Sequence, residues 1–125
     1  MIGIDIVSLP RFEKFLEKFP DKALQRFLNP DEISLVKTPQ NAAGLFAAKE
    51  AISKALGTGI SKECSFKDIV IHKDAKNAPY FTLTKHIIEK YTITDCALSI
   101  THDGGFAIAV AHIESKQKNK NPLCH

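Results

Sequence analysis

The strongest constraint on the fold is a stretch of alternating hydrophobicity at residues 96–111. Two alternating runs are joined there by Asp103-Gly104, a dipeptide typical of tight turns in β-hairpins. The second run places small and bulky residues on opposite faces of its strand. Its small face carries Ala107, Ala109 and Ala111, and its bulky face carries Phe106, Ile108 and Val110. We expect a hairpin whose alanine face permits close packing and serves as an interface.

The remaining residues divide into a helical first half and a strand-rich second half. Asn29-Pro30 followed by Asp31-Glu32 is typical of a helix start, with a capping residue, a first-position proline and an acidic first turn. The patterns predict a strand at 2–7, helices at 9–19, 21–28, 30–37, 41–56 and 84–91, and strands at 66–72, 80–84, 95–102 and 105–114. This order indicates an α+β fold, with helices packed on an antiparallel sheet.

Composition limits the classes of protein to which the chain can belong. With 125 residues, 44% of them hydrophobic, we expect one domain at 1–115 and a polar tail at 116–125. No signal segment or membrane span is visible, which predicts a cytoplasmic protein without membrane contact. Cys64, Cys96 and Cys124 suit reduced thiols, because they are odd in number and lack metal-ligand spacing. The net charge of +3 is too small to indicate nucleic-acid binding.

Residues 46–60 place a carboxylate and an ammonium group one helical turn apart, followed by glycines. Glu50 and Lys54 share a face, whereas the core stripe holds Leu45, Ala48, Ile52 and Leu56. This spacing suits an ordinary exposed ion pair, and it equally suits chemistry aimed at a phosphate. The alanines at 43, 47 and 51 leave room for a ligand or a neighbouring backbone. Gly57-Thr58-Gly59 can turn sharply around a ligand or can serve only as a helix C-cap.

Asp5 interrupts the apolar strand at 2–7, which we expect to be buried. Aspartate is disfavoured in strands, and among apolar neighbours its carboxylate needs backbone hydrogen bonds, a cation or a metal. If Asp5 and Glu50 converge, two hard oxygen ligands with an incomplete shell suit Mg²⁺, which takes further oxygens from water and substrate phosphates. His102 lies at the end of the hairpin strand, where it can contact an anion or can be a plain turn residue.

The helix expected at 9–19 is amphipathic, with Ser8 as its cap and Pro10 in its first turn. One side gathers apolar residues, and an adjacent side carries a basic stripe of Arg11, Lys14 and Lys18. The stripe suits docking of an acidic helix. It also suits a solvated face balanced by nearby glutamates.

Three motifs together resemble the holo-[acyl-carrier-protein] synthase family, the small 4′-phosphopantetheinyl transferases. The first is Gly-Ile-Asp-Ile-Val at 3–7, and the second is Phe-Ala-Ala-Lys-Glu-Ala at 46–51, continued by Lys-Ala at 54–55 and Gly-Thr-Gly-Ile at 57–60. The third is Ser-Ile-Thr-His at 99–102. Each motif alone is weak, but the three stand in the family's order, and the resemblance extends from residue 2 to about residue 113.

The resemblance implies transfer of 4′-phosphopantetheine from coenzyme A to a serine of apo acyl carrier protein, releasing adenosine 3′,5′-bisphosphate, in support of fatty acid biosynthesis. It implies the family's trimer-forming fold, with each active site between two subunits, so that His102 serves a neighbour. The implied site residues are Asp5 and Glu50 on Mg²⁺, Glu50 and Lys54 in catalysis, Lys54, Gly57, Thr58, Gly59 and His102 on coenzyme A, and Arg11, Lys14 and Lys18 on the carrier protein.

Two departures from the family pattern affect the expected coenzyme site. Leu45 stands where arginine is frequent, and Asn77-Ala78-Pro79-Tyr80 stands in place of Lys-Pro-Tyr. Lys37, Lys49 and Lys62 are candidates to replace the arginine. Two other classes of function fit the residues: a different Mg²⁺-dependent phosphate enzyme, such as a nucleotide hydrolase, and a basic binding module that needs no metal.

Overall fold

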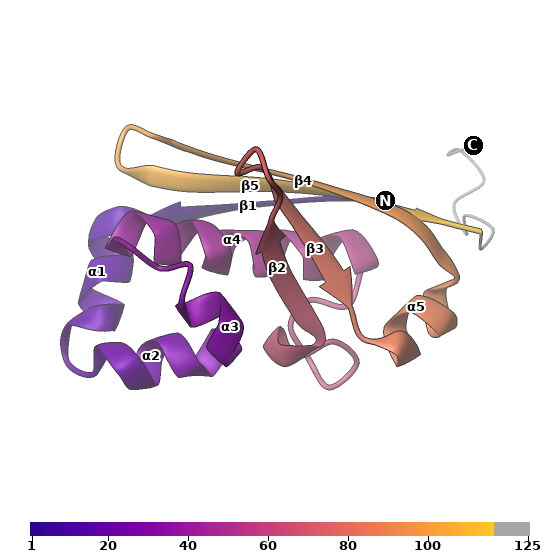
Figure 1. Ribbon diagram of the computed structural model, residues 1–125, viewed down its shortest axis with the longest axis horizontal. Helices are drawn as coiled ribbons and strands as arrows, with labels where there is room; N and C mark the ends of the chain where they lie inside the picture. Colours follow the sequence, from indigo (N-terminus) through magenta and orange to yellow (C-terminus); the bar gives the residue numbers. More distant parts are fainter. Residues whose placement is uncertain (117–125) are drawn as a thin grey trace.

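The computed structural model describes residues 1–116 and is built around one helix lying against one face of a sheet (Figure 1). The sheet is antiparallel, with strand order β1-β5-β4. Its strands are β1 (Ile2–Ser8), β4 (Ile93–Asp103) and β5 (Phe106–Ser115), and the helix is α4 (Pro39–Leu56). The predicted α+β fold and the hairpin at Asp103-Gly104 are confirmed.

Small residues bring α4 against the sheet. The alanines of β5 are fully buried beneath it, as are Ala47 and Ala51 on the helix. At Gly3 of β1 the approach is so close that a Cβ atom would lie 1.9 Å from the Ala51 carbonyl oxygen. The alanine face therefore serves an interface within the chain, and the room beside Ala51 is taken by the backbone of β1.

The ends of α4 follow from local chemistry. The Thr38 side chain accepts a hydrogen bond from the Asn41 N–H (3.2 Å), and Pro39 occupies the first turn. Gly57 ends the helix in the left-handed region, at φ +82°, where glycine avoids the strain of a side chain. The predicted stripe of Leu45, Ala48, Ile52 and Leu56 is buried, as expected.

Three helices precede α4 and cover one end of the molecule. They are α1 (Leu9–Glu17), α2 (Pro20–Phe27) and α3 (Pro30–Ile33). The helix expected at 30–37 is wrong in its length, because α3 spans one turn and the chain then leaves as a loop. Its start is as predicted: Glu32 Oε1 accepts a hydrogen bond from the Asn29 N–H (2.7 Å). Ser8 precedes α1, although its side chain makes no capping hydrogen bond.

A second, two-stranded sheet lies on the same side of the first sheet as the helices (Figure 1). It consists of β2 (Ile69–Lys73) and β3 (Pro79–Leu83), and it is followed by α5 (Lys85–Tyr91). The strand predicted at 66–72 begins later than expected, because a short 3₁₀ helix, η1 (Phe66–Asp68), precedes it. The Asp68 carboxylate accepts hydrogen bonds from the Ser65 N–H and hydroxyl, which stabilises this turn.

The other face of the three-stranded sheet is apolar and exposed. Ile2 is 72% exposed and Ile4 59%, so the expectation that this strand is buried is wrong for its isoleucine face in the single chain. Ile4 pairs with Val110 and Ile6 with Ile108, which extends the apolar surface across two strands. Within residues 1–116, every helix lies on the opposite face (Figure 1). The bulky face of the hairpin, and not its alanine face, is left without a cover.

Several expectations concern residues 117–125, which lie outside the described part of the chain. They are most of the polar tail and Cys124. Cys64 and Cys96 are free thiols, as expected. Among residues 1–116, no helix is both long and apolar enough to cross a membrane.

Replacing Gly3 with alanine tests the backbone contact between β1 and α4. We expect Gly3→Ala to lower the free energy of unfolding by about 3 kcal/mol, because its Cβ would collide with backbone atoms that cannot rotate away. Gly104→Ala is the control, since its φ of +57° is strained but its Cβ would meet nothing within 4 Å. Urea denaturation measures both, and a smaller loss for Gly3→Ala than for Gly104→Ala would contradict the proposed contact.

Candidate active site

Both predicted metal ligands line one pocket between β1, α1 and α4. This pocket, of about 360 Å³, contains Asp5, Glu50 and Arg11 together with an aromatic wall of Phe12, Phe15 and Phe46. We call it the carboxylate pocket. The close approach of β1 and α4 brings the two acids to one place although they are 45 positions apart in the sequence.

Asp5 has the cation that its apolar strand requires. Its Oδ1 lies 2.9 Å from Lys54 Nζ, which also donates to the Ile4 carbonyl (3.2 Å). The lysine side chain is about half exposed, whereas that of Asp5 is largely buried. Lys54 therefore has one side open to solvent, from which it can approach an anionic ligand.

Glu50 shares the negative charge of this pocket. Partial burial raises its pKa above the ordinary value of 4.5, the charge of Asp5 raises the pKa further, and Lys54 opposes both effects. The two carboxylates thus repel each other, and Lys54 compensates this repulsion only in part. A divalent cation would relieve this repulsion.

The donor set fits Mg²⁺. Both ligands are carboxylate oxygens, and among residues 1–116 no group of three or more His, Cys, Asp or Glu side chains could hold a metal. Mg²⁺ commonly binds through one or two carboxylates, with waters and substrate phosphates completing its octahedron. Asp5 and Glu50 would hold the ion and leave positions for phosphate oxygens.

The turn after α4 is a helix cap, and its backbone N–H groups already donate hydrogen bonds to carbonyls of the helix. The N–H groups of Thr58 and Gly59 donate to the Ser53 carbonyl, and that of Gly57 donates to the Lys54 carbonyl. Gly57, Thr58 and Gly59 do not line the carboxylate pocket. The C-cap interpretation of Gly57 is confirmed, and a role of this turn in binding coenzyme A stays a prediction.

His102 lies in a different pocket of the same chain. This His102 pocket, of about 420 Å³, has walls from four segments: the loop after α3, helix α4, the β2–β3 hairpin and strand β4. It is lined by Ser34, Leu35, Lys37, Asn41, Gly44, Leu45, Lys73, Asn77, Ile100 and His102. Two lysines and a histidine beside an apolar wall suit a ligand with a flat ring and an anionic group.

The hydrogen bond of His102 indicates which ring nitrogen carries a proton. Nε2 lies 2.9 Å from the Gln40 carbonyl oxygen, which can only accept, so Nε2 carries a proton. Nδ1 remains to accept a hydrogen bond, or to donate one when the ring is charged. Gly44 allows the ring to lie against α4, because a Cβ there would be 3.2 Å from Nε2.

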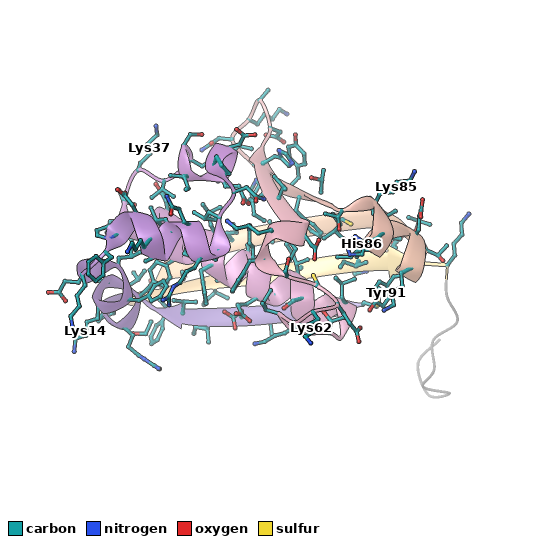
Figure 2. The ribbon with its side chains drawn as sticks, turned by 90° about the horizontal axis from the view of Figure 1, so that it is seen from below. Lys14, Lys37, Lys62, Lys85, His86 and Tyr91 are labelled. Atoms are coloured by element: carbon teal, nitrogen blue, oxygen red, sulfur yellow. The ribbon has the colours of Figure 1, made fainter. Side chains whose placement is uncertain are left out.

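The three lysines considered as replacements for the missing arginine have different positions. Leu45 and Lys37 both line the His102 pocket, which keeps Lys37 a candidate. Lys62 lies elsewhere on the molecule, well separated from Lys37 (Figure 2). Lys49 is fully buried 2.7 Å from Glu32, so the expectation that it could reach a nucleotide is wrong. Burial lowers the pKa of Lys49, and Glu32 opposes this shift.

The basic stripe on α1 is exposed, as the periodicity predicted. Arg11 lines the carboxylate pocket, whereas Lys14 and Lys18 point into solvent, with Lys14 at one end of the molecule (Figure 2). Beyond the helix, Phe19 is exposed, and the Lys22 ammonium lies 5.4 Å from the centre of its ring. The stripe therefore leads from solvent to the two carboxylates.

Sequence reasoning missed two parts of the site. The aromatic wall of Phe12, Phe15 and Phe46 was visible only as helix periodicity, which does not distinguish a core residue from a pocket lining. Lys73 of the β2–β3 hairpin lines the His102 pocket without any sequence motif to indicate it, whereas Asn77 of the same hairpin belongs to the segment that stands in place of Lys-Pro-Tyr. Asn77 has a φ of +65°, a conformation that asparagine tolerates and that shapes the hairpin turn.

Comparisons with known proteins show the family of the chain. Residues 1–111 match the 4′-phosphopantetheinyl transferase superfamily. A holo-[acyl-carrier-protein] synthase of Nautilia profundicola is 62% identical over 109 residues, which cover 87% of this chain and 95% of the relative. The chain belongs to the holo-[acyl-carrier-protein] synthase family. The resemblance drawn from the three motifs is thereby confirmed, as is the assignment to the transferases.

Solved structures of holo-[acyl-carrier-protein] synthases share the fold. The Helicobacter pylori enzyme, crystallised with coenzyme A, is 52% identical with a TM-score of 0.88, covering 91% of this chain and 100% of that one. The Bacillus anthracis enzyme, in complex with CoA (3′,5′-ADP), is 40% identical with a TM-score of 0.77, covering 92% and 96%. The 4′-phosphopantetheinyl transferase fold expected for this member of the family is confirmed.

The shared charge of the carboxylate pocket predicts a pH-dependent metal effect. Since the folded-state pKa of Glu50 is raised, its protonated form favours folding below the ordinary value of 4.5, and this stability is lost as the pH rises through the folded pKa. We expect metal-free Glu50→Gln to melt at the same or a higher temperature than wild type at pH 7. We also expect Mg²⁺ to raise the wild-type melting temperature at pH 7 and to do so less at pH 5.

Differential scanning fluorimetry between pH 5 and 8, with and without Mg²⁺, measures both effects. Glu89→Gln is the control, because Glu89 is exposed on α5, away from the pocket. A Glu50→Gln protein that melts several degrees below wild type at pH 7 without metal would contradict the repulsion.

Proposed function

We propose that the chain transfers 4′-phosphopantetheine from coenzyme A to a serine hydroxyl of apo acyl carrier protein, in a Mg²⁺-dependent reaction that releases adenosine 3′,5′-bisphosphate. The observation that carries the proposal is the convergence of Asp5 and Glu50 on one pocket beside Lys54. The names of the relatives and the coenzyme A in the Helicobacter pylori structure support the substrates.

In this reaction a phosphorus–oxygen bond forms to the serine and the diphosphate bond to the nucleotide breaks. Asp5 and Glu50 would hold Mg²⁺, which supplies neutralisation of charge on the diphosphate. Lys54 adds a fixed positive charge at the same place and stabilises the leaving phosphate. Glu50 accepts the serine proton, directly or through a water molecule. The rest of the rate enhancement comes from holding the two substrates in line for the transfer.

We further propose that the protein works as a homotrimer with each active site between two subunits. The support is the exposed apolar face of the sheet, because contiguous apolar patches mark protein interfaces. The separation of His102 from the carboxylate pocket within one chain is a second reason. In a ring of subunits, the His102 pocket of one chain meets the carboxylate pocket of the next, and the coenzyme spans both.

The carrier protein docks on α1 in this proposal. Arg11, Lys14 and Lys18 attract the acidic carrier and raise its association rate more than its final affinity. Arg11 lines the carboxylate pocket itself, so it is the first choice for a contact near the reacting serine. The exposed ring of Phe19 adds an apolar anchor at the far end of this surface.

The cellular setting belongs to the same proposal. Transfer to acyl carrier protein supports fatty acid biosynthesis, and we place it in the cytoplasm. The free thiols of Cys64 and Cys96 suit a reducing compartment.

The direct test is the intact mass of apo acyl carrier protein after incubation with this protein, coenzyme A and Mg²⁺. We expect a gain of one phosphopantetheine group, blocked by a chelator and lost in Glu50→Gln, because that variant keeps the shape of the side chain but removes a metal ligand charge. Retained activity in Glu50→Gln would overturn the metal assignment. Hydrolysis of coenzyme A without any gain in carrier mass would indicate a phosphate hydrolase instead.

Mixed trimers test the shared active site. Glu50→Gln and His102→Ala, each inactive alone, should together recover about a quarter of the wild-type activity when co-expressed in equal amounts, since one interface in four then pairs two intact residues. Light scattering should give three subunits for every sample. Mixed trimers without activity would show that both residues act within one subunit.

A further inference from the structure

One buried ion pair lies outside both pockets and is used by neither the metal nor the transfer step. Glu32 of α3 and Lys49 of α4 meet at 2.7 Å, and both side chains are 0% exposed. Removing two charges from water offsets most of their attraction, so apolar residues of similar size often stabilise a core equally well. The pair therefore suggests a role in fixing an arrangement, beyond its contribution to core stability.

The pair joins four segments of the backbone. The Glu32 carboxylate accepts from the N–H of Asn29 (2.7 Å) and from the N–H of Ile71 on β2 (2.8 Å). Lys49 Nζ donates to the Phe66 carbonyl (3.0 Å) at the start of η1. One buried contact thus holds the α3 turn, α4, η1 and β2 at fixed distances from each other.

Three of these segments lead directly into the walls of the His102 pocket. Ser34 follows Glu32 by two residues, and Lys73 follows Ile71 by two. Leu45 lies one helical turn before Lys49 on α4, and so projects from the same side of that helix. The pocket opening is therefore set by the positions of the segments that the pair ties together.

We propose that the Glu32–Lys49 pair is a positioning device that sets the affinity of the His102 pocket for coenzyme A without touching the reacting atoms. This inference rests on the proposed function. Glu50 is adjacent to Lys49 in sequence but lines the carboxylate pocket, because successive helical residues point in different directions. Disturbing the pair should weaken coenzyme binding and leave the metal site unchanged.

The test is the double variant Glu32→Gln/Lys49→Met, which removes both buried charges, retains one side-chain carbonyl to accept from the backbone, and fills the lysine volume. We expect the KM for coenzyme A to rise about tenfold, with kcat within about twofold of wild type and an unchanged Mg²⁺ concentration for half-maximal rate. The control is Lys85→Met/Glu89→Gln, which removes an exposed pair (3.8 Å) on α5 and should change none of these constants.

Each outcome decides the proposal. An unchanged KM for coenzyme A in the folded double variant overturns it, and so does a loss of kcat and Mg²⁺ dependence together with KM, which would indicate a general effect on the fold. If the double variant does not fold, Glu32→Asp replaces it, because the shorter carboxylate keeps the charge but cannot span both backbone N–H groups. The same tenfold rise in the KM for coenzyme A is expected.

If wild type transfers no group, the proposed function fails, and calorimetry of coenzyme A binding to the same variants tests the positioning role separately.

Discussion

The close contact between α4 and the sheet is the constraint from which the site follows. Because Gly3 has no side chain, the backbone of β1 approaches Ala51 directly, and the buried alanines of β5 continue this surface. Asp5 lies two residues beyond Gly3 on the same face of the strand, and Lys54 lies one turn beyond Ala51 on the helix. Their 2.9 Å contact is thus a consequence of the backbone packing. Larger side chains at this contact would separate the groups that meet in the carboxylate pocket.

Two acid–lysine pairs in this chain have opposite designs. Glu32 and Lys49 are closed from solvent, and each also makes hydrogen bonds to backbone groups. Asp5 and Lys54 are open on one side, and the charge of Asp5 raises the pKa of the nearby Glu50 although Lys54 opposes this shift. The closed pair suits a fixed framework. The open one suits a site that receives a cation and a phosphate, at the expense of some stability in the metal-free protein.

The separation of the carboxylate and His102 pockets is one reason for proposing that the active site is shared between subunits. Asp5 and Glu50 line one, and His102 with Lys37 lines the other. Residues of β1 and β5 form the apolar outer face of the sheet, and β1 also supplies Asp5 to the carboxylate pocket. In the proposed assembly through this face, the subunit interface and the proposed metal site would both use β1.

The sequence by itself determined the elements and the chemistry of the motifs. Asp103-Gly104 identified the hairpin, and Pro39 and Gly57 agree with the ends of α4, because turns and caps depend on local backbone conformation. Only the tertiary structure decided which faces are covered. Alternation placed the isoleucines of β1 on one face, but a strand pattern does not specify what lies against it. Lys49 is buried against Glu32, and Lys73 lines the His102 pocket, because distant segments of the chain pack together. Hydrophobic periodicity within one segment does not predict such contacts.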